Sequence, residues 1–350
     1  MEHKFPYKWT LADAVFTKDK GKVFSCFACG GGSTMGYKLA GFNVIGCNEI
    51  DPKMMSAYIA NHNPKYSYLE PIQTFKNRED LPSELFDLDI LDGSPPCSSF
   101  SMAGNREKDW GKEKKFREGQ SEQVLDTLFF DFIDLAKRLQ PKVVVAENVK
   151  GLLMGSAIQY VRRIYDAFDR AGYECQHFLL DASKMGVPQI RERVFFIAIR
   201  NDLSEQFMRQ VDMFTYRPEL KMWFDEFEIP FTQIKKFDVV RDKIREGCMK
   251  HWSGADSLGY SYVTRNKDRF GFYFTAIDSL VCRTVTCGVS IAISERPELL
   301  TDEEIIEIGS FPSDYNFNGN KPQYIIGMSV PPVMTAQIAT RIYDQWLKLF

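Results

Sequence analysis

Residues 23–33, VFSCFACGGGS, decide the fold that we expect for this chain. The apolar residues 23–27 are typical of a buried β-strand, and the glycines that end at Gly32 indicate a tight turn. We expect a helix to follow from Ser33 to Ala40. A strand, a glycine-rich turn and a helix in this order begin many nucleotide-binding α/β sheets, although such a turn alone is also compatible with a purely structural role.

The alternation of strands and helices continues to about residue 200. Further strands are expected at residues 43–47, 86–91, 143–146 and 194–199, and further helices at residues 52–61, 120–139, 158–171 and 333–347. This pattern predicts a parallel α/β sheet. From residue 201 to about 280 the alternation fades and aromatic residues become frequent, which indicates a second, smaller domain.

The composition, with 44% hydrophobic and 26% charged residues among 350, is that of an ordinary soluble globular protein. No apolar run is long enough to span a bilayer, and residues 1–6 lack the order of a secretory signal, so we expect a cytoplasmic protein without a membrane partner. The net charge of −3 argues against a uniformly basic nucleic-acid binder but leaves room for a local basic cleft.

The eight cysteines are scattered and do not form the pattern of a disulfide scaffold. Cys26 and Cys29 have the spacing of half a zinc site, but no second pair follows, and the four histidines are not paired. We therefore expect no metal site.

An acidic residue follows the second expected strand. Glu49 lies 17 residues after Gly32, where a carboxylate can accept hydrogen bonds from ribose hydroxyl groups. With the glycine turn, this position indicates a cofactor that contains a nucleoside, either of the NAD type or S-adenosylmethionine. An NAD-dependent oxidoreductase is disfavoured, because no nearby residue offers the acid that hydride transfer needs.

Cys97 differs from the other cysteines because it follows two prolines, in the segment Ser94-Pro95-Pro96-Cys97. Each proline holds its own φ at about −65°, so the cysteine is presented on a stiff segment after a strand. Ligands of parallel sheets bind at that end of the strands. The alternative is an inert buried cysteine, but such a residue needs no stiff mount.

Two further segments carry polar residues that suit a reaction. Glu147 and Asn148 follow an apolar strand, where a carboxyl group can handle a proton; a solvated strand end is the alternative. Gln189, Arg191 and Arg193 alternate along an extended segment and so share one face. Such a face suits an anion or the carbonyl edge of a base, and a surface strand with ion pairs is the alternative.

The order of these motifs resembles that of the DNA (cytosine-5)-methyltransferase family. The matching motifs are the glycine turn, NEID at residues 48–51, PPC at 95–97, ENV at 147–149, QxRxR at 189–193 and GMSV at 327–330. The resemblance covers nearly the whole chain except residues 1–20 and about 201–280. It implies an α/β fold with a Rossmann-like S-adenosylmethionine-dependent methyltransferase sheet. The catalytic domain would comprise residues 1–200 and 320–350, and the target-recognition domain residues 201–319.

The resemblance also implies an activity, the transfer of a methyl group from S-adenosylmethionine to C5 of a flipped-out cytosine in a specific double-stranded DNA sequence. Cys97 would add to C6 and form a covalent intermediate, Glu147 would handle the proton at N3, and Arg193 would hold the cytosine O2. Arg191 would order the active site, and Asn148 would brace the Cys97 loop.

A set of cofactor contacts follows from the same resemblance: Phe27, Cys29, Gly30, Gly32, Ser33, Glu49, Ile50, Asp92, Pro96, Ser329 and Val330. Three positions depart from the family pattern. Cys29 replaces a glycine, Pro71 replaces an aspartate, and Met328 replaces an asparagine. These departures concern the contacts to the cofactor rather than the reaction at Cys97.

Two basic segments are the candidates for DNA contact. We expect the loop at residues 98–119 to close over DNA phosphates, and the turn at residues 264–269, TRNKDR, to reach a groove. A solvated hairpin is the alternative for the second segment. The DNA-contacting residues that we predict are Ser99, Arg106, Gln189, Arg265, Lys267 and Arg269.

We expect a monomer that acts on double-stranded DNA. A cognate restriction endonuclease fits this type of enzyme but needs no physical association with it. Two alternatives remain open. One is a tRNA cytosine-5 methyltransferase of the same fold, although the size of the recognition module favours DNA. The other is a non-catalytic DNA-binding relative, against which the presence of Cys97, Glu147 and Arg193 argues.

Overall fold

The computed structural model describes residues 2–96, 113–114, 123–124, 127–213, 215–249, 261–266 and 269–350. The chain forms two compact units. The sheet unit comprises Phe16–Leu180, Glu192–Trp223 and Ile338–Phe350, and the second unit comprises Met1–Val15, Asp181–Arg191 and Phe224–Gln337. Within the described residues, no helix is long and apolar enough to cross a membrane.

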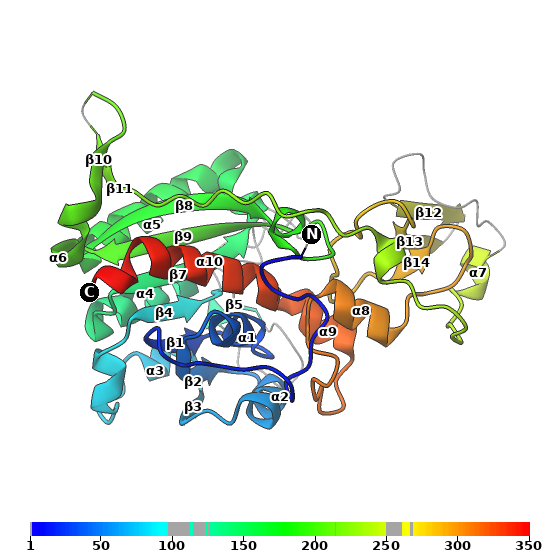
Figure 1. The fold of residues 1–350 in the computed structure, drawn as a ribbon, viewed down its shortest axis with the longest axis horizontal. Helices are drawn as coiled ribbons and strands as arrows, with labels where there is room; N and C mark the ends of the chain where they lie inside the picture. Colours follow the sequence, from blue (N-terminus) through cyan, green and yellow to red (C-terminus); the bar gives the residue numbers. More distant parts are fainter. Residues whose placement is uncertain are drawn as a thin grey trace. The chain divides into compact units, whose positions relative to one another are not determined.

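A seven-stranded sheet, counted over the described residues, forms the centre of the sheet unit, in the order β3-β2-β1-β4-β7-β9-β8 (Figure 1). The strands are β1 (Lys22–Cys26), β2 (Asn43–Glu49), β3 (Tyr66–Leu69), β4 (Ile90–Gly93), β7 (Val143–Val149), β8 (Tyr173–Asp181) and β9 (Glu192–Arg200). β1 pairs in parallel with β2 and β4, and β4 pairs in parallel with β7. β9 runs antiparallel to β7, so the sheet is mixed.

The helices of this unit include α1 (Gly32–Leu39), α2 (Pro52–His62), α3 (Ile72–Phe75), α4 (Leu128–Leu139), α5 (Ile158–Ala171), α6 (Asn201–Ser204) and the end of α10 (Pro332–Gln345). α4 and α5 lie side by side (Figure 1). α5 buries Tyr160, Ile164 and Phe168 at helical spacing, which explains why this segment is an amphipathic helix. It ends at Gly172, whose φ of 89° suits a left-handed cap.

Two short strand pairs also belong to the sheet unit. β5 (Glu113–Lys114) pairs with β6 (Gln123–Val124), and β10 (Met208–Gln210) pairs with β11 (Tyr216–Pro218), both antiparallel. Residues 201–223, which we predicted to lie in the target-recognition domain, thus pack in the sheet unit. The indole of the buried Trp346 explains this placement, because it packs on Phe207 and donates a hydrogen bond of 2.9 Å to the Glu219 carbonyl.

Most predicted elements of the sheet are confirmed. The strands expected at residues 23–27, 43–47, 143–146 and 194–199 correspond to β1, β2, β7 and β9, and the helix expected at residues 158–171 coincides with α5. The strand expected at residues 86–91 is wrong in its first half. Ser83–Phe86 forms a 3-10 helix, η1, which buries Leu85, and β4 begins only at Ile90. Neither β3 nor β8 was predicted.

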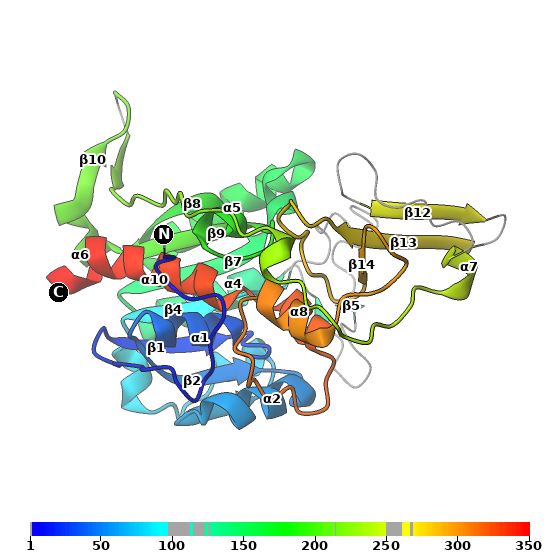
Figure 2. The same cartoon turned by 45° about the vertical axis from the view of Figure 1, so that its right-hand side comes forward.

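The second unit contains a small sheet formed by β12 (Ser261–Asn266), β13 (Arg269–Ala276) and β14 (Ile291–Ile293) (Figure 2). β12 runs antiparallel to β13, and β14 runs parallel to it. The unit also contains α7 (Glu246–Met249), α8 (Asp302–Ile308) and α9 (Pro322–Met328). A capping box between Thr301 and Glu304 and a buried ion pair between Glu304 and Arg241 fix the start of α8.

Candidate active site

The predicted site residues of the sheet unit gather where parallel strands end. β1, β2, β4 and β7 run in the same direction, so their carboxyl ends lie at one edge of the sheet. Cys26 ends β1, Glu49 ends β2, Gly93 ends β4, and Glu147 lies near the end of β7. This is the edge at which open α/β sheets bind their ligands.

The glycine turn after β1 has a left-handed backbone at three of its positions. Phe27 has a φ of 52°, Cys29 of 49° and Gly31 of 81°. A Cβ atom at Gly31 would lie 2.3 Å from Nε2 of His62, so only glycine fits there. Cys29, which stands where the family pattern has glycine, therefore adopts a left-handed backbone conformation that favours glycine.

Glu49 ties this turn to the end of β2. One carboxylate oxygen accepts a hydrogen bond of 2.7 Å from the Cys29 amide, and the other accepts bonds of 2.9 Å from the amides of Ile50 and Asp51. Glu49 is buried, and burial raises the pKa of its carboxyl group. Because a carboxylate has several acceptor sites, these contacts leave room for the ribose hydroxyl groups expected at this position.

Asp92 on β4 is also buried, and hydroxyl groups surround it. Its Oδ2 accepts hydrogen bonds of 2.8 Å from both Ser25 and Ser33, and its Oδ1 accepts one of 3.2 Å from Tyr37. Burial is the main reason why the pKa of Asp92 is raised to about 6. Ser33 was expected to open a helix, but α1 begins one residue earlier, at Gly32, with Gly31 as its cap. The Ser33 side chain binds Asp92.

Glu147 and Arg193 form a direct ion pair, with 2.9 Å between Oε1 of Glu147 and Nε of Arg193. The two side chains are 14% and 17% exposed, so the pair is mostly shielded yet still open to a ligand. Burial lowers the pKa of the Arg193 guanidinium, and Glu147 opposes that effect. β7 and β9 place the pair, since they align Val149 with Arg193. Glu147 and Arg193, which were both predicted to contact cytosine, thus contact each other directly.

Asn148 binds the proline segment that precedes Cys97. Its side-chain amide donates a hydrogen bond of 3.2 Å to the carbonyl of Pro95 and accepts one of 2.9 Å from the Val149 amide. Pro96, the predicted cofactor contact, is half-buried beside it. The segment that precedes Cys97 is therefore fixed to the end of β7.

Gln189 and Arg191 act inside the second unit. The Gln189 amide donates to the Ile308 carbonyl at 3.0 Å and accepts from the Val285 amide at 3.2 Å. The Arg191 guanidinium donates to the carbonyls of Val285 and Gly327, both at 3.1 Å. Gln189 is fully buried, so this placement favours a bracing role over the DNA contact that we predicted.

The GMSV motif begins in a helix rather than in the strand-like turn that its sequence predicted. Gly327 and Met328 end α9, because Pro322 starts that helix and Ile325 is buried at helical spacing. Ser329 and Val330 follow it and are buried. Ser329 Oγ has no hydrogen-bond partner among the described residues, as expected of an atom that meets a ligand.

These donors and acceptors fit S-adenosylmethionine. Within the sheet unit, a buried carboxylate ends the second strand at Glu49, and a turn that tolerates close approach precedes α1. Pro71, the second departure, caps α3 without a side-chain hydrogen bond.

Several predicted residues lie outside the described residues, namely Cys97, Ser99, Arg106 and Lys267. For Arg265 and Arg269 the structure describes the backbone, which pairs Arg265 with Phe270 and Asn266 with Arg269 across β12 and β13. The turn predicted at residues 264–269 is therefore wrong at residues 264–266, which belong to β12, and at residue 269, which belongs to β13.

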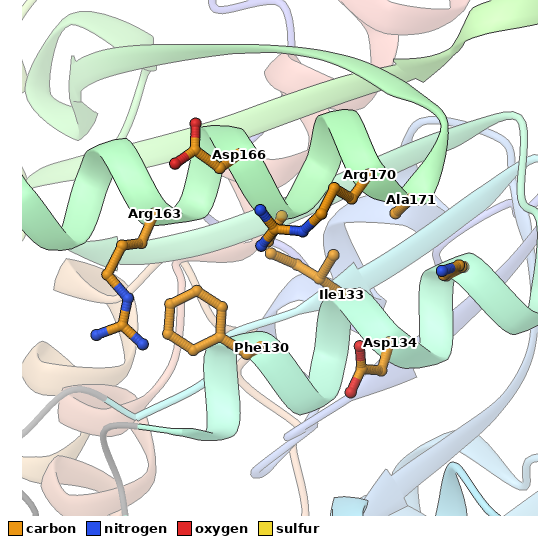
Figure 3. A pocket seen from close by; sticks show the side chains of 9 residues that line it. Phe130, Ile133, Asp134, Arg163, Asp166, Arg170 and Ala171 are labelled. Atoms are coloured by element: carbon orange, nitrogen blue, oxygen red, sulfur yellow. The ribbon is translucent and has the colours of Figure 1, made fainter.

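A cavity of about 520 Å³ lies between α4 and α5, and its lining residues include none of the predicted catalytic residues (Figure 3). Phe130, Arg163, Asp166 and Arg170 contribute to its wall, and the Arg163 guanidinium lies 4.8 Å from the centre of the Phe130 ring. The wall carries acidic and basic side chains at helical spacing, which is typical of a solvated helix face.

Sequence reasoning missed three residues that support the site. Ser25 and Tyr37 bind Asp92, and His62 fills the space beside Gly31. Ser25 belongs to an apolar strand, so its hydroxyl group carried no signal of its own. Tyr37 lies four residues after Ser33, and that helical spacing is the only hint that both face the same partner.

Comparison with known proteins places the chain in a family. A model of C-5 cytosine-specific DNA methylases matches residues 21–344. The Type II methyltransferase M.FnuDI of Fusobacterium nucleatum is 36% identical over 183 residues, which cover 52% of this chain and 48% of that protein. M1.HphI of Haemophilus parahaemolyticus is 26% identical over 330 residues, covering 90% and 85%.

The chain spans about half the length of the first curated relatives that it matches. The crystal structure of a Spodoptera frugiperda DNMT2 mutant has the same fold, with a TM-score of 0.64 and 18% identity over 92% of this chain and 99% of that one. The family model, which covers most of the sequence, shows that the chain belongs to the C-5 cytosine-specific DNA methylase family.

Proposed function

We propose that this protein transfers a methyl group from S-adenosylmethionine to C5 of cytosine in a specific double-stranded DNA sequence. The observation that carries the proposal is the ion pair between Glu147 and Arg193, which lies next to the proline segment that Asn148 holds. A carboxylate and a guanidinium side by side match the N3 and O2 edge of cytosine, which presents adjacent polar atoms.

S-Adenosylmethionine supplies an electrophilic methyl group when it is bound. Glu49 would hold its ribose, and the turn at Gly30 and Gly32 would face its charged end, with Phe27, Ile50 and Val330 as further contacts. Ser329 would meet it through a hydroxyl group that has no partner among the described residues. These roles rest on the buried Glu49 carboxylate and on the conformation of the turn.

Cys97 supplies the nucleophile, because C5 of cytosine does not attack a methyl group unaided. Its thiolate forms a bond to C6, and the displaced electron pair moves toward N3, where Glu147 shares a proton. Arg193 holds O2 through this step. The activated C5 then takes the methyl group, a base removes the C5 proton, and the bond between Cys97 and C6 breaks as the thiolate leaves.

Base flipping and sequence recognition complete the proposed function. C6 is stacked inside a duplex, so the cytosine must leave the helix before Cys97 can reach it. We assign phosphate contact to Ser99 and Arg106 and groove contact to Lys267, to Arg265 on β12 and to Arg269 on β13. A monomer in the cytoplasm suffices for this chemistry, with or without a cognate restriction endonuclease.

The test is transfer of labelled methyl groups into duplex DNA that contains many cytosines, with tRNA as the alternative substrate. Wild-type protein should label DNA, and Cys97→Ser should reduce labelling to background while it retains wild-type circular dichroism. Near-normal transfer by Cys97→Ser would overturn the covalent route. Labelling of tRNA alone would overturn the DNA assignment.

A further inference from the structure

We infer that Asp92 is a positioning residue whose ionised carboxylate fixes the start of α1, so that cofactor affinity depends on whether Asp92 is ionised. The inference rests on the proposed function, because that function assigns the turn before α1 to S-adenosylmethionine. Asp92 was predicted to contact the cofactor itself. Its geometry instead points to an indirect action through the turn.

The contacts of Asp92 connect β4 to the turn on two sides. Ser25 on β1 lies opposite Asp92 in the parallel register, one residue before Cys26, where β1 ends. Ser33 follows Gly32 directly, and Tyr37 lies one helical turn further along α1. Strand end and helix start are therefore both bound to a single carboxylate, and the glycine turn lies between them.

Ionisation matters to this arrangement because of hydrogen-bond chemistry. A carboxylate only accepts, so it can take the O–H groups of Ser25, Ser33 and Tyr37 at once. A protonated carboxyl group carries an O–H of its own, so one hydroxyl group must turn from donor to acceptor. Protonation therefore breaks or rearranges a contact that positions the turn.

Among the described residues, the groups that act on Asp92 do not neutralise its charge. The titratable groups that act on it or respond to it are Cys26 on β1, Tyr37 on α1, Tyr58 on α2 and Glu147 on β7, and none of these four is a cation. A buried carboxylate of this kind is costly to keep ionised, and Glu147 adds to that cost. Retaining it suits a residue that serves the neighbouring site.

The raised pKa of about 6 puts the change within an accessible pH range. Above that pH the carboxylate holds the turn, and affinity should be highest. Below it, affinity should fall. Other groups near the turn also titrate: burial raises the pKa of Glu49, and burial lowers the pKa of both His62 and Lys38, the latter to about 8.

The experiment is calorimetric titration of S-adenosylmethionine, without DNA, into wild-type protein and Asp92→Asn between pH 5 and pH 8. The ratio of the two dissociation constants isolates Asp92, because Glu49, His62, Lys38 and the ligand itself titrate in both proteins. At pH 8 the variant should bind about tenfold more weakly, the effect of one hydrogen bond to a charged group. At pH 5 the two affinities should converge.

Two further variants guard against a general loss of structure. Ser33→Ala removes one hydrogen-bond donor to Asp92 but leaves the Asp92 carboxylate in place. The variant should therefore bind S-adenosylmethionine more weakly and still lose affinity at low pH, as we expect of wild type. Asp89→Asn removes a carboxylate just before β4, where Asp89 accepts from the Lys22 amide and from Lys142 Nζ, both at 2.7 Å, and it should bind as wild type does.

Equal affinity and an equal pH profile for wild type and Asp92→Asn would overturn the inference while leaving the proposed function intact. A constant ratio across the pH range would also overturn it, because that result means a purely structural defect. A wild-type protein that binds no S-adenosylmethionine at any pH would overturn the proposed function, and the inference with it.

Discussion

Asp92 and Glu147 are both largely buried carboxylates near the ends of neighbouring strands, and the protein holds them in different ways. β4 and β7 align Asp92 with Val145, so Glu147 lies two residues further along. Hydroxyl groups of Ser25, Ser33 and Tyr37 surround Asp92, whereas Arg193 pairs with Glu147. Hydroxyl groups fix a carboxylate without neutralising it, while a guanidinium neutralises it and can exchange partners with a substrate.

The comparison separates two tasks at one edge of the sheet. In our proposal, Asp92 holds the shape of the cofactor turn, and Glu147 with Arg193 meets the cytosine that reacts. The two carboxylates still influence each other, because Glu147 helps to raise the pKa of Asp92. Variants of each residue should therefore fail in different assays.

The largest effect is expected from Glu147→Gln. Loss of the proton-handling carboxyl group should slow methyl transfer about a thousandfold, within the usual range for a general acid or base, and leave S-adenosylmethionine affinity unchanged. Single-turnover transfer into duplex DNA and calorimetric binding measure the two quantities. A variant that transfers methyl groups within tenfold of the wild-type rate, or that loses cofactor binding, would contradict the separate roles that we assign to Glu147 and Asp92.

Asp92→Asn should change how stability depends on pH. The folded pKa of Asp92 is raised from 3.8 to about 6, so the native state binds this proton more tightly than the unfolded state does. The Asp92 contribution therefore lowers the free energy of unfolding as pH rises from about 4 to 6, by about 3 kcal/mol, and is flat above. Urea unfolding of the variant should lack this fall.

The same measurement on Asp89→Asn is the matched control, because Asp89 pairs with Lys142 rather than with hydroxyl groups. The Asp89→Asn variant should show the same decline in the free energy of unfolding between pH 4 and pH 6 that we expect of wild type. If Asp92→Asn shows the same decline as wild type, the carboxylate is not the buried, costly charge that we describe.

Gln189→Ala extends the comparison to the second unit. The buried Gln189 amide binds Ile308 and Val285, so its loss should cost about 2 kcal/mol of unfolding free energy by leaving both groups without this partner. The slope of DNA affinity against salt should not change, because a buried bracing residue meets no phosphate. A shallower salt slope would restore the DNA contact predicted from sequence.

The smallest effect is expected from Cys29→Gly. The residue has a φ of 49°, and a left-handed conformation costs a residue with a side chain about 1 kcal/mol relative to glycine. The variant should therefore be slightly more stable, with unchanged cofactor affinity, because the Cys29 amide still reaches Glu49. A loss of affinity would show that the thiol itself serves the site.

Local pattern predicted much of this fold. The apolar run of β1, the helical spacing of α5 and the cap at Gly172 all follow from short-range rules that later packing did not override. The same rules failed at residues 86–89, where an apolar pair, Leu85 and Phe86, suggested a strand but belongs to a 3-10 helix. They also failed at Gly327, which ends a helix rather than forming a turn.

The sequence indicated the position of site residues where a single short motif places them at the end of one strand. The Asn148 side chain binds the Pro95 carbonyl, because Asn148 lies near the end of β7 and Pro95 follows the adjacent parallel strand β4. The partners of Asp92 were not predictable, since they depend on strand register and on the rotation of α1. The burial of Gln189 was missed for a similar reason: alternation shows which residues share a face but not what covers that face.

The most direct test of the account is a covalent trap. Duplex DNA in which 5-fluorocytosine replaces the target base has no C5 proton to remove, so a protein that adds to C6 and transfers the methyl group should remain attached. Mass spectrometry of the digested complex is predicted to find the methylated base on Cys97, and Cys97→Ser should give no complex. An adduct on another residue, or methylation of ordinary duplex without any trapped complex, would contradict the account.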